Sequence, residues 1–272
     1  MTDVLTGDLV AAISGAVLEG PNDRRVRGIT HDSRRIGAEG VFVALREANS
    51  DGHRYIGDAL QRGASALLVE RLEGPAPPDV AVIRVGDTWR AYGPAAAAVY
   101  GHPSRSLTVF AVTGTNGKTS TTHLIRSICR AAGLRAGLIG TLGALIEDEW
   151  LEAPHTTPYA GDLQEMLARM RAAGLQAVAM EASSHALAQH RLDGVRVSAA
   201  VFTNLTRDHL DFHGTMENYF LAKARLFTEL AAEAGEDFVS VVNVDDPWGR
   251  ERLAGMARGR VVTYGLAPDA QV

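Results

Sequence analysis

The sequence has a single cysteine, Cys129, so no disulfide can form within the chain, which fits a reducing compartment. It has no excess of positive charge, because the formal net charge is -5, and this gives the chain no overall attraction to nucleic acid or an anionic membrane. No segment approaches the roughly 20 apolar residues of a membrane span. The first residues also lack the basic and apolar regions of a signal peptide. We therefore expect a cytoplasmic protein with no nucleic-acid or membrane partner.

The remaining composition is typical of a globular protein, with 46% hydrophobic and 22% charged residues. The 272 residues are enough for two ordinary domains. A break at 101–104, which reads Gly-His-Pro-Ser, directly precedes a strongly apolar run. We therefore predict one domain over residues 1–103 and a second over 104–272.

Hydrophobic patterns predict strands and helices on both sides of this break. In the first region they predict strands over 27–31, 41–45, 64–69 and 80–85, and helices over 54–62 and 88–100. In the second they predict strands over 107–113, 135–139, 176–181, 197–204, 238–244 and 261–264, and helices over 118–132, 161–173 and 216–234. Short apolar strands that alternate with helices indicate a mostly parallel sheet covered on both faces. The fold class is therefore α/β, a small α/β domain followed by a P-loop-type domain with a mostly parallel sheet.

One short segment indicates phosphate binding: Thr113-Gly114-Thr115-Asn116-Gly117-Lys118-Thr119. It joins an apolar strand to a helix, as a phosphate-binding loop does. Glycines let backbone N–H groups turn toward phosphate oxygens, and the helix start adds partial positive charge. Lys118 would supply a cation to the terminal phosphates and Thr119 a hydroxyl to Mg²⁺. We expect ATP to contact Gly114, Thr115, Asn116, Gly117, Lys118, Thr119 and Ser120.

The spacing of this loop departs from the general P-loop pattern, because Val112 stands where that pattern has a glycine. The alternative is an ordinary glycine turn at the start of a core helix. The strong strand and helix on either side favour the phosphate loop. The helix carries an apolar stripe at 124, 125, 128, 129 and 132, and Cys129 on that stripe is predicted to pack in the core.

Polar residues follow the other predicted strands of the second region. Glu181 ends one strand, His209 follows the next, and Asn243 and Asp246 follow a third. Because the carboxyl ends of parallel strands meet at one edge of a sheet, these side chains are expected to converge with Lys118. Ordinary loop polarity is the alternative for any one of them.

Lys223 lies in the middle of an apolar helical stripe. Such a lysine usually extends its amine to solvent or pairs with a carboxylate. If it cannot, burial disfavours its charge. A neutral amine can add CO₂ to become a carbamate, whose two oxygens suit a hard metal ion.

Two further stretches, 31–35 and 155–158, display hydroxyl, imidazole and charged groups on loops. Such groups suit sugar, diphosphate or peptide ligands. The alternative is simple turn formation by Asp, Ser and Pro.

Taken together, these sequence segments resemble the corresponding segments of the Mur ligase family. The similar segments are 32–34 with 40–44, 51–56, 112–119, 156–158, 180–187, 189–191, 202–211, 219–223 and 243–246, in family order across nearly the whole chain. The N-terminal Asp-Ser-Arg and the Ser-Ser-His-Ala-Leu string favour the branch that adds a diamino acid. The resemblance implies a monomeric ligase of peptidoglycan synthesis, in which ATP phosphorylates the D-glutamate γ-carboxylate of UDP-MurNAc-L-Ala-D-Glu. The amine of meso-diaminopimelate or L-lysine then attacks the acyl phosphate.

The resemblance also implies roles for individual residues. It places one Mg²⁺ on Thr119 and Glu181 and a second on His209 and a carbamylated Lys223, and it places Asn243 and Asp246 near the nucleotide. Lys118, His209 and Lys223 would be catalytic. The substrate-binding residues would be His31, Ser33, Ala48, Asn49 and Ser50 for the UDP-sugar, and Thr156, Thr157, Ser183, Gln189 and Arg191 for the acyl peptide.

The sequence differs from the family pattern in two respects. Residues 46–50 lack the His-Gln found there in some relatives. Family members are also substantially longer, so the rest of the central sheet and the C-terminal domain that binds the incoming amino acid are not in this sequence. Two alternatives stay open: another ligase of the superfamily, such as a MurF-like or folylpolyglutamate enzyme, and a non-catalytic module that binds a nucleotide or UDP-sugar.

Overall fold

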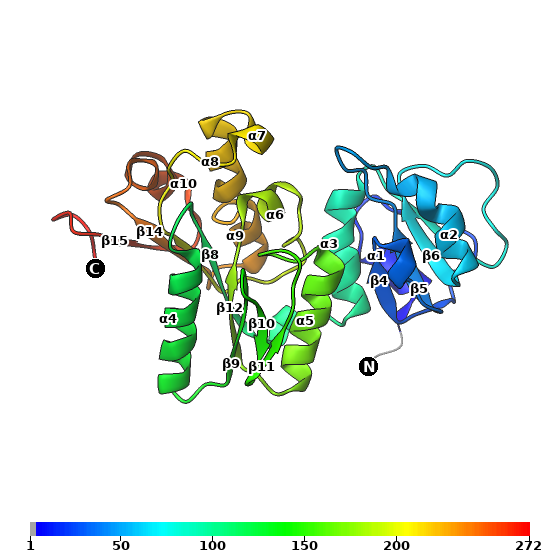
Figure 1. The fold of residues 1–272 in the computed structure, drawn as a ribbon, viewed down its shortest axis with the longest axis horizontal. Coiled ribbons are helices and arrows are strands. Elements are labelled where there is room, and N and C mark those ends of the chain that lie inside the picture. The colour runs from blue at the N-terminus through cyan, green and yellow to red at the C-terminus, as the bar shows by residue number, and fades with distance from the viewer. Residues whose placement is uncertain (1–3) are drawn as a thin grey trace. The chain divides into compact units, whose positions relative to one another are not determined.

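The computed structural model describes residues 4–272 (Figure 1). The chain divides into two compact units. The first comprises the described residues up to Pro103 together with Tyr159–Ala168 and His190–Gly194, and the second comprises Ser104–Pro158, Arg169–Gln189 and Val195–Val272. Two short segments from beyond residue 103 therefore pack with the first unit, which the sequence pattern did not predict.

The first unit contains a five-stranded sheet in the order β2-β7-β6-β5-β4. Its strands are β2 (Val17–Glu19), β4 (Gly28–Thr30), β5 (Gly40–Val43), β6 (Ala64–Val69) and β7 (Ala81–Arg84), and only β2 pairs antiparallel with its neighbour. A short ribbon of β1 (Val4–Leu5) and β3 (Arg25–Val26) is separate. The helices are α1 (Thr6–Ala11), α2 (Ile56–Gln61) and α3 (Thr88–Val99), with single 3₁₀ turns at Ser33–Arg35 and Gly52–Tyr55. A third 3₁₀ turn, Pro103–Ser106, lies at the boundary between the units.

Alternation along the central strands of this sheet builds a core on each face. Val41 and Val43 of β5 lie in one cluster with residues of α1 and α3, whereas Phe42 lies in the other with residues of α2. Leu67 and Leu68 of β6 divide between the two clusters in the same way. All five side chains are fully buried, so both faces of the sheet are covered.

The second unit contains an eight-stranded sheet in the order β11-β10-β9-β12-β8-β13-β14-β15. The strands are β8 (Thr108–Thr113), β9 (Ala136–Gly140), β10 (Gly143–Ile146), β11 (Glu149–Leu151), β12 (Ala177–Glu181), β13 (Ala199–Phe202), β14 (Val239–Asn243) and β15 (Arg260–Tyr264). All pairings are parallel except those of β10. The sheet extends from β8 through β12 on one side and through β13 on the other. The loop after β8 therefore lies at the point where the strand order reverses, the usual ligand-binding position in such sheets.

The helices of this unit are α4 (Lys118–Ala131), α6 (Ser184–Ala188), α7 (Leu210–His213), α8 (Met216–Ala224), α9 (Glu229–Ala234) and α10 (Ala254–Met256), with a π-helical turn at Gly249–Leu253. Helix α5 (Ala160–Ala172) begins in the first unit and ends in the second. Helix α4 packs on β8, β9 and β12 (Figure 1). The predicted α/β fold class is confirmed. Among residues 4–272, no helix is both long enough and apolar enough to cross a bilayer.

One local prediction was wrong. The helix predicted over 216–234 is two helices, because residues 226–228 form tighter turns and the Thr228 hydroxyl donates to the Ala224 carbonyl at 3.0 Å. Cys129 packs against Ala136 and Ala177, as predicted, whereas Leu124 and Ile128 of the same stripe are exposed. The β10–β11 hairpin was not predicted, because its strands are short.

Candidate functional site

The loop between β8 and α4 has the conformation of an anion cradle. Gly114 and Gly117 have φ values of +148° and +85°, which side-chain-bearing residues rarely adopt. Gly117 is the N-cap of α4, and no described side chain caps that helix start. The first N–H groups of α4 and the positive end of its dipole therefore face the loop. This arrangement fits the phosphates that the sequence predicts there.

The loop is held in place by the segment that follows β13. The Asn204 amide is a two-point clamp, because its Oδ1 accepts from the Asn116 N–H at 3.0 Å and its Nδ2 donates to the Asn116 carbonyl at 3.2 Å. The Thr115 N–H donates to the Asn204 carbonyl at 2.8 Å. The Thr203 hydroxyl donates to the Asn116 carbonyl at 2.6 Å. Sequence reasoning did not assign these roles, since they depend on the β8–β13 pairing.

Gly114→Ala is expected to disrupt this loop. A Cβ at Gly114 would lie 1.9 Å from the Thr203 Oγ1, and the φ of +148° adds backbone strain. We expect a loss of roughly 2 kcal/mol or more in the free energy of unfolding, measured by urea denaturation. The matched control is Gly133→Ala, which has a positive φ of +81° but open space around the new Cβ, so it tests backbone strain alone. Equal losses in the two variants would show that the contact with Thr203 is not what requires glycine.

The only two lysines in the sequence meet at this loop. The Lys118 Nζ donates to the carbonyls of Gly114 at 3.0 Å and Thr115 at 2.8 Å, and the Lys223 Nζ donates to the same Gly114 carbonyl at 2.8 Å. Lys223 is 2% exposed, and burial, assisted by the charge of Lys118, holds its pKa well below the usual value. Burial also lowers the pKa of Lys118, an effect that Glu181 opposes. The predicted inward-pointing amine of Lys223 is therefore present beside the phosphate loop.

Glu181 is the second buried charged group at this edge of the sheet, with 1% exposure. Its Oε1 accepts from the Thr119 hydroxyl at 2.9 Å and from the Thr141 N–H at 2.9 Å. A hydroxyl and a carboxylate are ligands that Mg²⁺ prefers. Thr119 and Glu181 thus fit the predicted first metal position, whose open coordination places phosphate oxygens and water would complete.

Among the described residues, His209 makes no hydrogen bond, ion pair or ring contact with Glu181 or Lys223. Its side chain is 46% exposed, and its ring packs edge-on against His185 with centroids 4.8 Å apart. Tyr219 links the two predicted ligands of the second metal. The His209 ring centroid lies 6.0 Å from that of Tyr219, and the Lys223 Nζ lies 4.6 Å from it. The Tyr219 hydroxyl also contacts the Thr115 Oγ1 at 3.1 Å, so Tyr219 is a further residue of the site that sequence reasoning missed.

His213 is expected to make the stability of the second unit depend on pH in the acid range. Burial, followed by the charges of His185, Lys223 and His209, lowers the pKa of His213 to about 4, with a small opposing effect from Asp211. In the unfolded chain an imidazole titrates near 6.5. As the pH falls from 6.5 toward 4 the unfolded state therefore takes up a proton that the folded state refuses, and the folded state loses stability in that window.

We expect His213→Asn to reduce this loss. Urea midpoints at pH 7 and pH 5 should lie closer together in the variant than in the wild-type chain. Asn cannot titrate but can still bond with the Ser184 hydroxyl, which contacts the His213 Nε2 at 3.0 Å. An unchanged difference between the two midpoints would contradict a neutral, buried His213.

The predicted acyl-peptide residues divide between the two units. In the second unit the Thr157 hydroxyl donates to the Glu181 carbonyl at 2.8 Å and accepts from the Ser183 N–H at 3.0 Å. The Thr156 hydroxyl contacts the Thr141 Oγ1 at 3.2 Å. Gln189 also belongs to the second unit, as the C-cap of α6, whereas Arg191 belongs to the first. Thr156, Thr157 and Ser183 therefore gather around the end of β12, next to the predicted metal position.

Asn243 and Asp246 hold the segment behind the phosphate loop. The Asn243 Nδ2 donates to the Thr203 carbonyl at 2.7 Å, and the Asp246 Oδ2 accepts from the Leu205 N–H at 2.9 Å. The Asp246 Oδ1 also accepts from the N–H groups of Trp248 and Gly249. These contacts engage both side chains with backbone, and direct contact with the nucleotide stays a prediction for each.

The first unit builds its predicted ligand loop as a short hairpin turn over residues 46–51, here called the 46–51 hairpin. Arg46 and Asp51 form an antiparallel bridge, and the Glu47 N–H donates to the Ser50 carbonyl at 2.8 Å. Ala48 and Asn49 are exposed at the tip, where the sequence predicts contact with the UDP-sugar. Ser33 lies elsewhere in this unit, buried in the 3₁₀ turn after β4.

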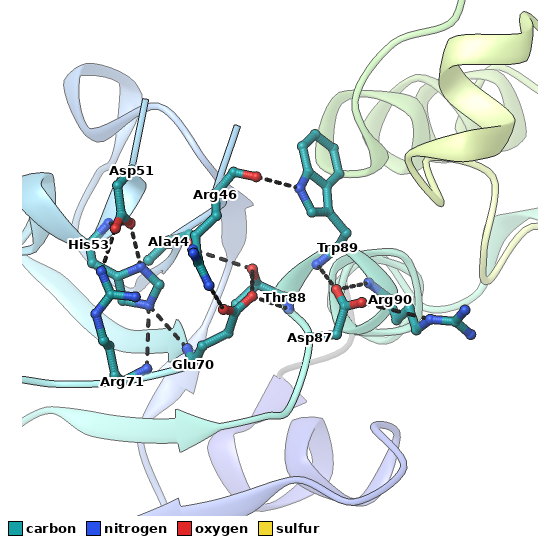
Figure 2. Close-up of polar contacts among 10 residues, drawn as sticks. All are labelled: Ala44, Arg46, Asp51, His53, Glu70, Arg71, Asp87, Thr88, Trp89 and Arg90. Carbon is teal, nitrogen blue, oxygen red and sulfur yellow. Dashed lines mark hydrogen bonds and ion pairs between the residues drawn. The ribbon is translucent and has the colours of Figure 1, made fainter. Parts of the chain in front are cut away.

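Both legs of the 46–51 hairpin are anchored by side chains (Figure 2). Asp51 accepts from the N–H and Nδ1 of His53 at 3.1 Å and 2.7 Å, and the His53 Nε2 accepts from the Glu70 N–H at 3.1 Å. On the other leg, Glu70 contacts Arg46 at 3.4 Å, and the Trp89 indole N–H donates to the Arg46 carbonyl at 2.9 Å. Side-chain contacts therefore fix both legs of the 46–51 hairpin, whereas its tip is exposed.

Together, a glycine loop at the switch point of a parallel sheet, two converging lysines and a hydroxyl paired with a buried carboxylate form the arrangement expected of a nucleotide-binding α/β protein. Residues 112–272 match the model of the Mur ligase middle domain, and residues 25–101 match that of the Mur ligase family catalytic domain. The chain belongs to the Mur ligase family.

Two similar sequences are named UDP-N-acetylmuramoyl-L-alanyl-D-glutamate–2,6-diaminopimelate ligase. The protein of Geobacter metallireducens is 44% identical over 97% of this chain and 52% of its own length, and that of Aquifex aeolicus is 42% identical over 92% and 50%. A solved structure of a ligase with the same name superposes with a TM-score of 0.81 at 29% identity, over 98% of this chain and 53% of the other. A MurF structure from Acinetobacter baumannii, with a TM-score of 0.65 at 21% identity over 99% and 54%, shares the fold. The chain thus spans about half the length of the relatives it matches.

Proposed function

We propose that this chain carries the UDP-sugar-binding and ATP-binding parts of a ligase that adds 2,6-diaminopimelate to UDP-MurNAc-L-Ala-D-Glu. The observation that supports it most is the convergence of Lys118, Lys223, Thr119 and Glu181 on one loop after β8. The diamino acid follows the printed names of the relatives. The first unit would bind the UDP-sugar, the second would bind ATP, and the protein would act as a cytoplasmic monomer.

The site residues have distinct tasks in this proposal. Bound ATP with Mg²⁺ supplies the phosphoryl group that activates the D-glutamate γ-carboxylate. Lys118 leaves its carbonyl partners and offsets charge on the terminal phosphates, while the N–H groups of the loop and of α4 orient them. Thr119 and Glu181 would hold a Mg²⁺ ion, which would offset negative charge on the phosphates.

Lys223 and His209 would hold a second metal ion on the acyl side. The neutral amine of Lys223 can add CO₂, and the resulting carbamate supplies anionic oxygens where the amine has none. Thr156, Thr157, Ser183, Gln189 and Arg191 would orient the acyl peptide, with Arg191 pairing with an anionic oxygen. His31, Ser33 and the tip of the 46–51 hairpin would bind the UDP-sugar.

Phosphate release is the measurement that tests this function. In a protein that also carries the family's amino-acid-binding domain, we expect release from ATP to require both UDP-MurNAc-L-Ala-D-Glu and 2,6-diaminopimelate, and to fall to background when either is left out. Binding of ATP and of the UDP-sugar peptide without any release would instead support the non-catalytic module. Release that requires a different acceptor, such as a folate or a UDP-MurNAc-tripeptide, would assign another ligase of the superfamily.

A further inference from the structure

Two aromatic side chains, Tyr159 and Trp89, lie among the predicted ligand-binding groups of the first unit. Tyr159 immediately follows the Thr-Thr-Pro string, and Trp89 lies in the first turn of α3. Neither was singled out by the sequence patterns. Their contacts join His31, the 46–51 hairpin and Arg191, which come from three separate stretches of the chain.

Tyr159 is enclosed on both faces of its ring. The His31 ring stacks on it with centroids 4.0 Å apart and an interplanar angle of 25°, and the Arg191 Cζ lies 3.9 Å from its centroid. Two groups at this distance cannot share one face, so His31 and Arg191 lie on opposite faces. The Tyr159 hydroxyl donates to the Glu47 Oε1 at 2.6 Å. Burial and this bond raise the pKa of Tyr159 to about 12, so it remains a donor at neutral pH.

Trp89 connects this stack to the base of the 46–51 hairpin. Its ring stacks near that of Tyr159, with centroids 5.8 Å apart and an interplanar angle of 24°. Its indole N–H donates to the Arg46 carbonyl at 2.9 Å (Figure 2). Asp87 fixes the backbone of Trp89 by accepting from its N–H at 2.9 Å. The hairpin is therefore held at its base by Trp89 and at Glu47 by Tyr159.

We propose that Tyr159 and Trp89 are positioning residues that fix His31, the 46–51 hairpin and Arg191 relative to one another before the UDP-sugar peptide binds. This inference rests on the proposed function. Ordering these groups in advance removes an entropy cost from binding. A cation–π contact with Tyr159 also restricts the position of the Arg191 guanidinium.

The test is calorimetric binding of UDP-MurNAc-L-Ala-D-Glu, with UDP alone as a second ligand. Tyr159→Phe removes only the hydroxyl, and we expect about 10-fold weaker binding of the peptide ligand. Trp89→Phe removes the indole N–H, and we expect binding about 5-fold weaker. Thermal unfolding midpoints should remain those of the wild type, because both variants keep an aromatic ring in place.

Matched controls are Tyr55→Phe, whose ring is 49% exposed, and Arg90→Ala, the neighbour of Trp89 in α3. Both should bind like the wild type. A double-mutant cycle distinguishes positioning from a general structural role. The double variant Glu47→Ala, Tyr159→Phe should bind the peptide ligand no more weakly than the weaker-binding single variant, because both substitutions remove the same hydrogen bond.

The outcomes separate the two proposals. If the wild-type chain binds the ligand and the two aromatic variants bind it equally well, the positioning role is wrong and the proposed function stands. Losses that are additive in the cycle, or that accompany a fall in the unfolding midpoint, also overturn the positioning role. If the wild-type chain binds neither ligand, the proposed function fails and the inference fails with it.

Discussion

Lys223→Met is expected to abolish ligase turnover while making the folded chain more stable. The lysine amine is 2% exposed, and placing it there costs free energy that an apolar side chain of similar length does not. The Gly114 carbonyl would not lose all its donors, since the Lys118 Nζ also contacts it at 3.0 Å. Removing a metal-holding anion should lower the phosphate-release rate by about 10³-fold. A higher unfolding midpoint together with lost turnover would separate a functional lysine from a structural one.

The carbamate itself can be detected directly, because the sequence has only two lysines. With [¹³C]bicarbonate, the wild-type chain should show a carbamate carbon resonance that Lys223→Met lacks. The matched control is Lys118→Met, which should retain that resonance. A wild-type spectrum without it, or a Lys223→Arg variant with full turnover, would contradict carbamylation, because a guanidinium cannot replace a carbamate as a metal ligand.

Lys118→Met is expected to have the largest effect on nucleotide binding. In the described structure the Lys118 Nζ lies within the phosphate loop, where it bonds to the carbonyls of Gly114 and Thr115. Charge-assisted hydrogen bonds to phosphate contribute about 1.5–3 kcal/mol. We therefore expect about 10- to 150-fold weaker binding of Mg·ATP by calorimetry.

The control for the Lys118→Met variant is its binding of UDP. UDP should bind Lys118→Met and the wild-type chain equally, because Lys118 belongs to the second unit and the predicted UDP-sugar residues to the first. Arg126→Met serves as a cation control on the same helix α4. Its guanidinium donates to the Ala136 and Glu147 carbonyls rather than to the loop. Unchanged Mg·ATP affinity in Lys118→Met would contradict the phosphate loop.

Much of the second unit could be predicted from sequence because its signals are local. The apolar run of β8, the glycines and Lys118 are contiguous, and the strand ending at Glu181 is a single apolar segment. The convergence of Glu181 with Lys118 followed from the rule for parallel sheets. Lys223 was found because a lysine interrupts an apolar stripe. The helix break after it was not, since the Thr228 bond depends on local geometry rather than on periodicity.

The parts of the site that were missed depend on pairing between distant segments. Asn204 clamps Asn116 only because β13 lies beside β8, and Tyr159 stacks on His31 across more than a hundred residues of sequence. A tyrosine after Thr-Thr-Pro carries no pattern of its own. The exposure of Leu124 and Ile128 could not be predicted from the pattern of α4, because periodicity shows which residues share a face and not what covers that face.

Anomalous diffraction from Mn²⁺, bound with a non-hydrolysable ATP analogue, tests the central claim most directly. We predict a peak that lies between the Thr119 hydroxyl, the Glu181 carboxylate and the analogue's terminal phosphates, with the Lys118 amine turned onto those phosphates. A peak remote from Glu181, or an analogue bound away from the loop after β8, would contradict the account.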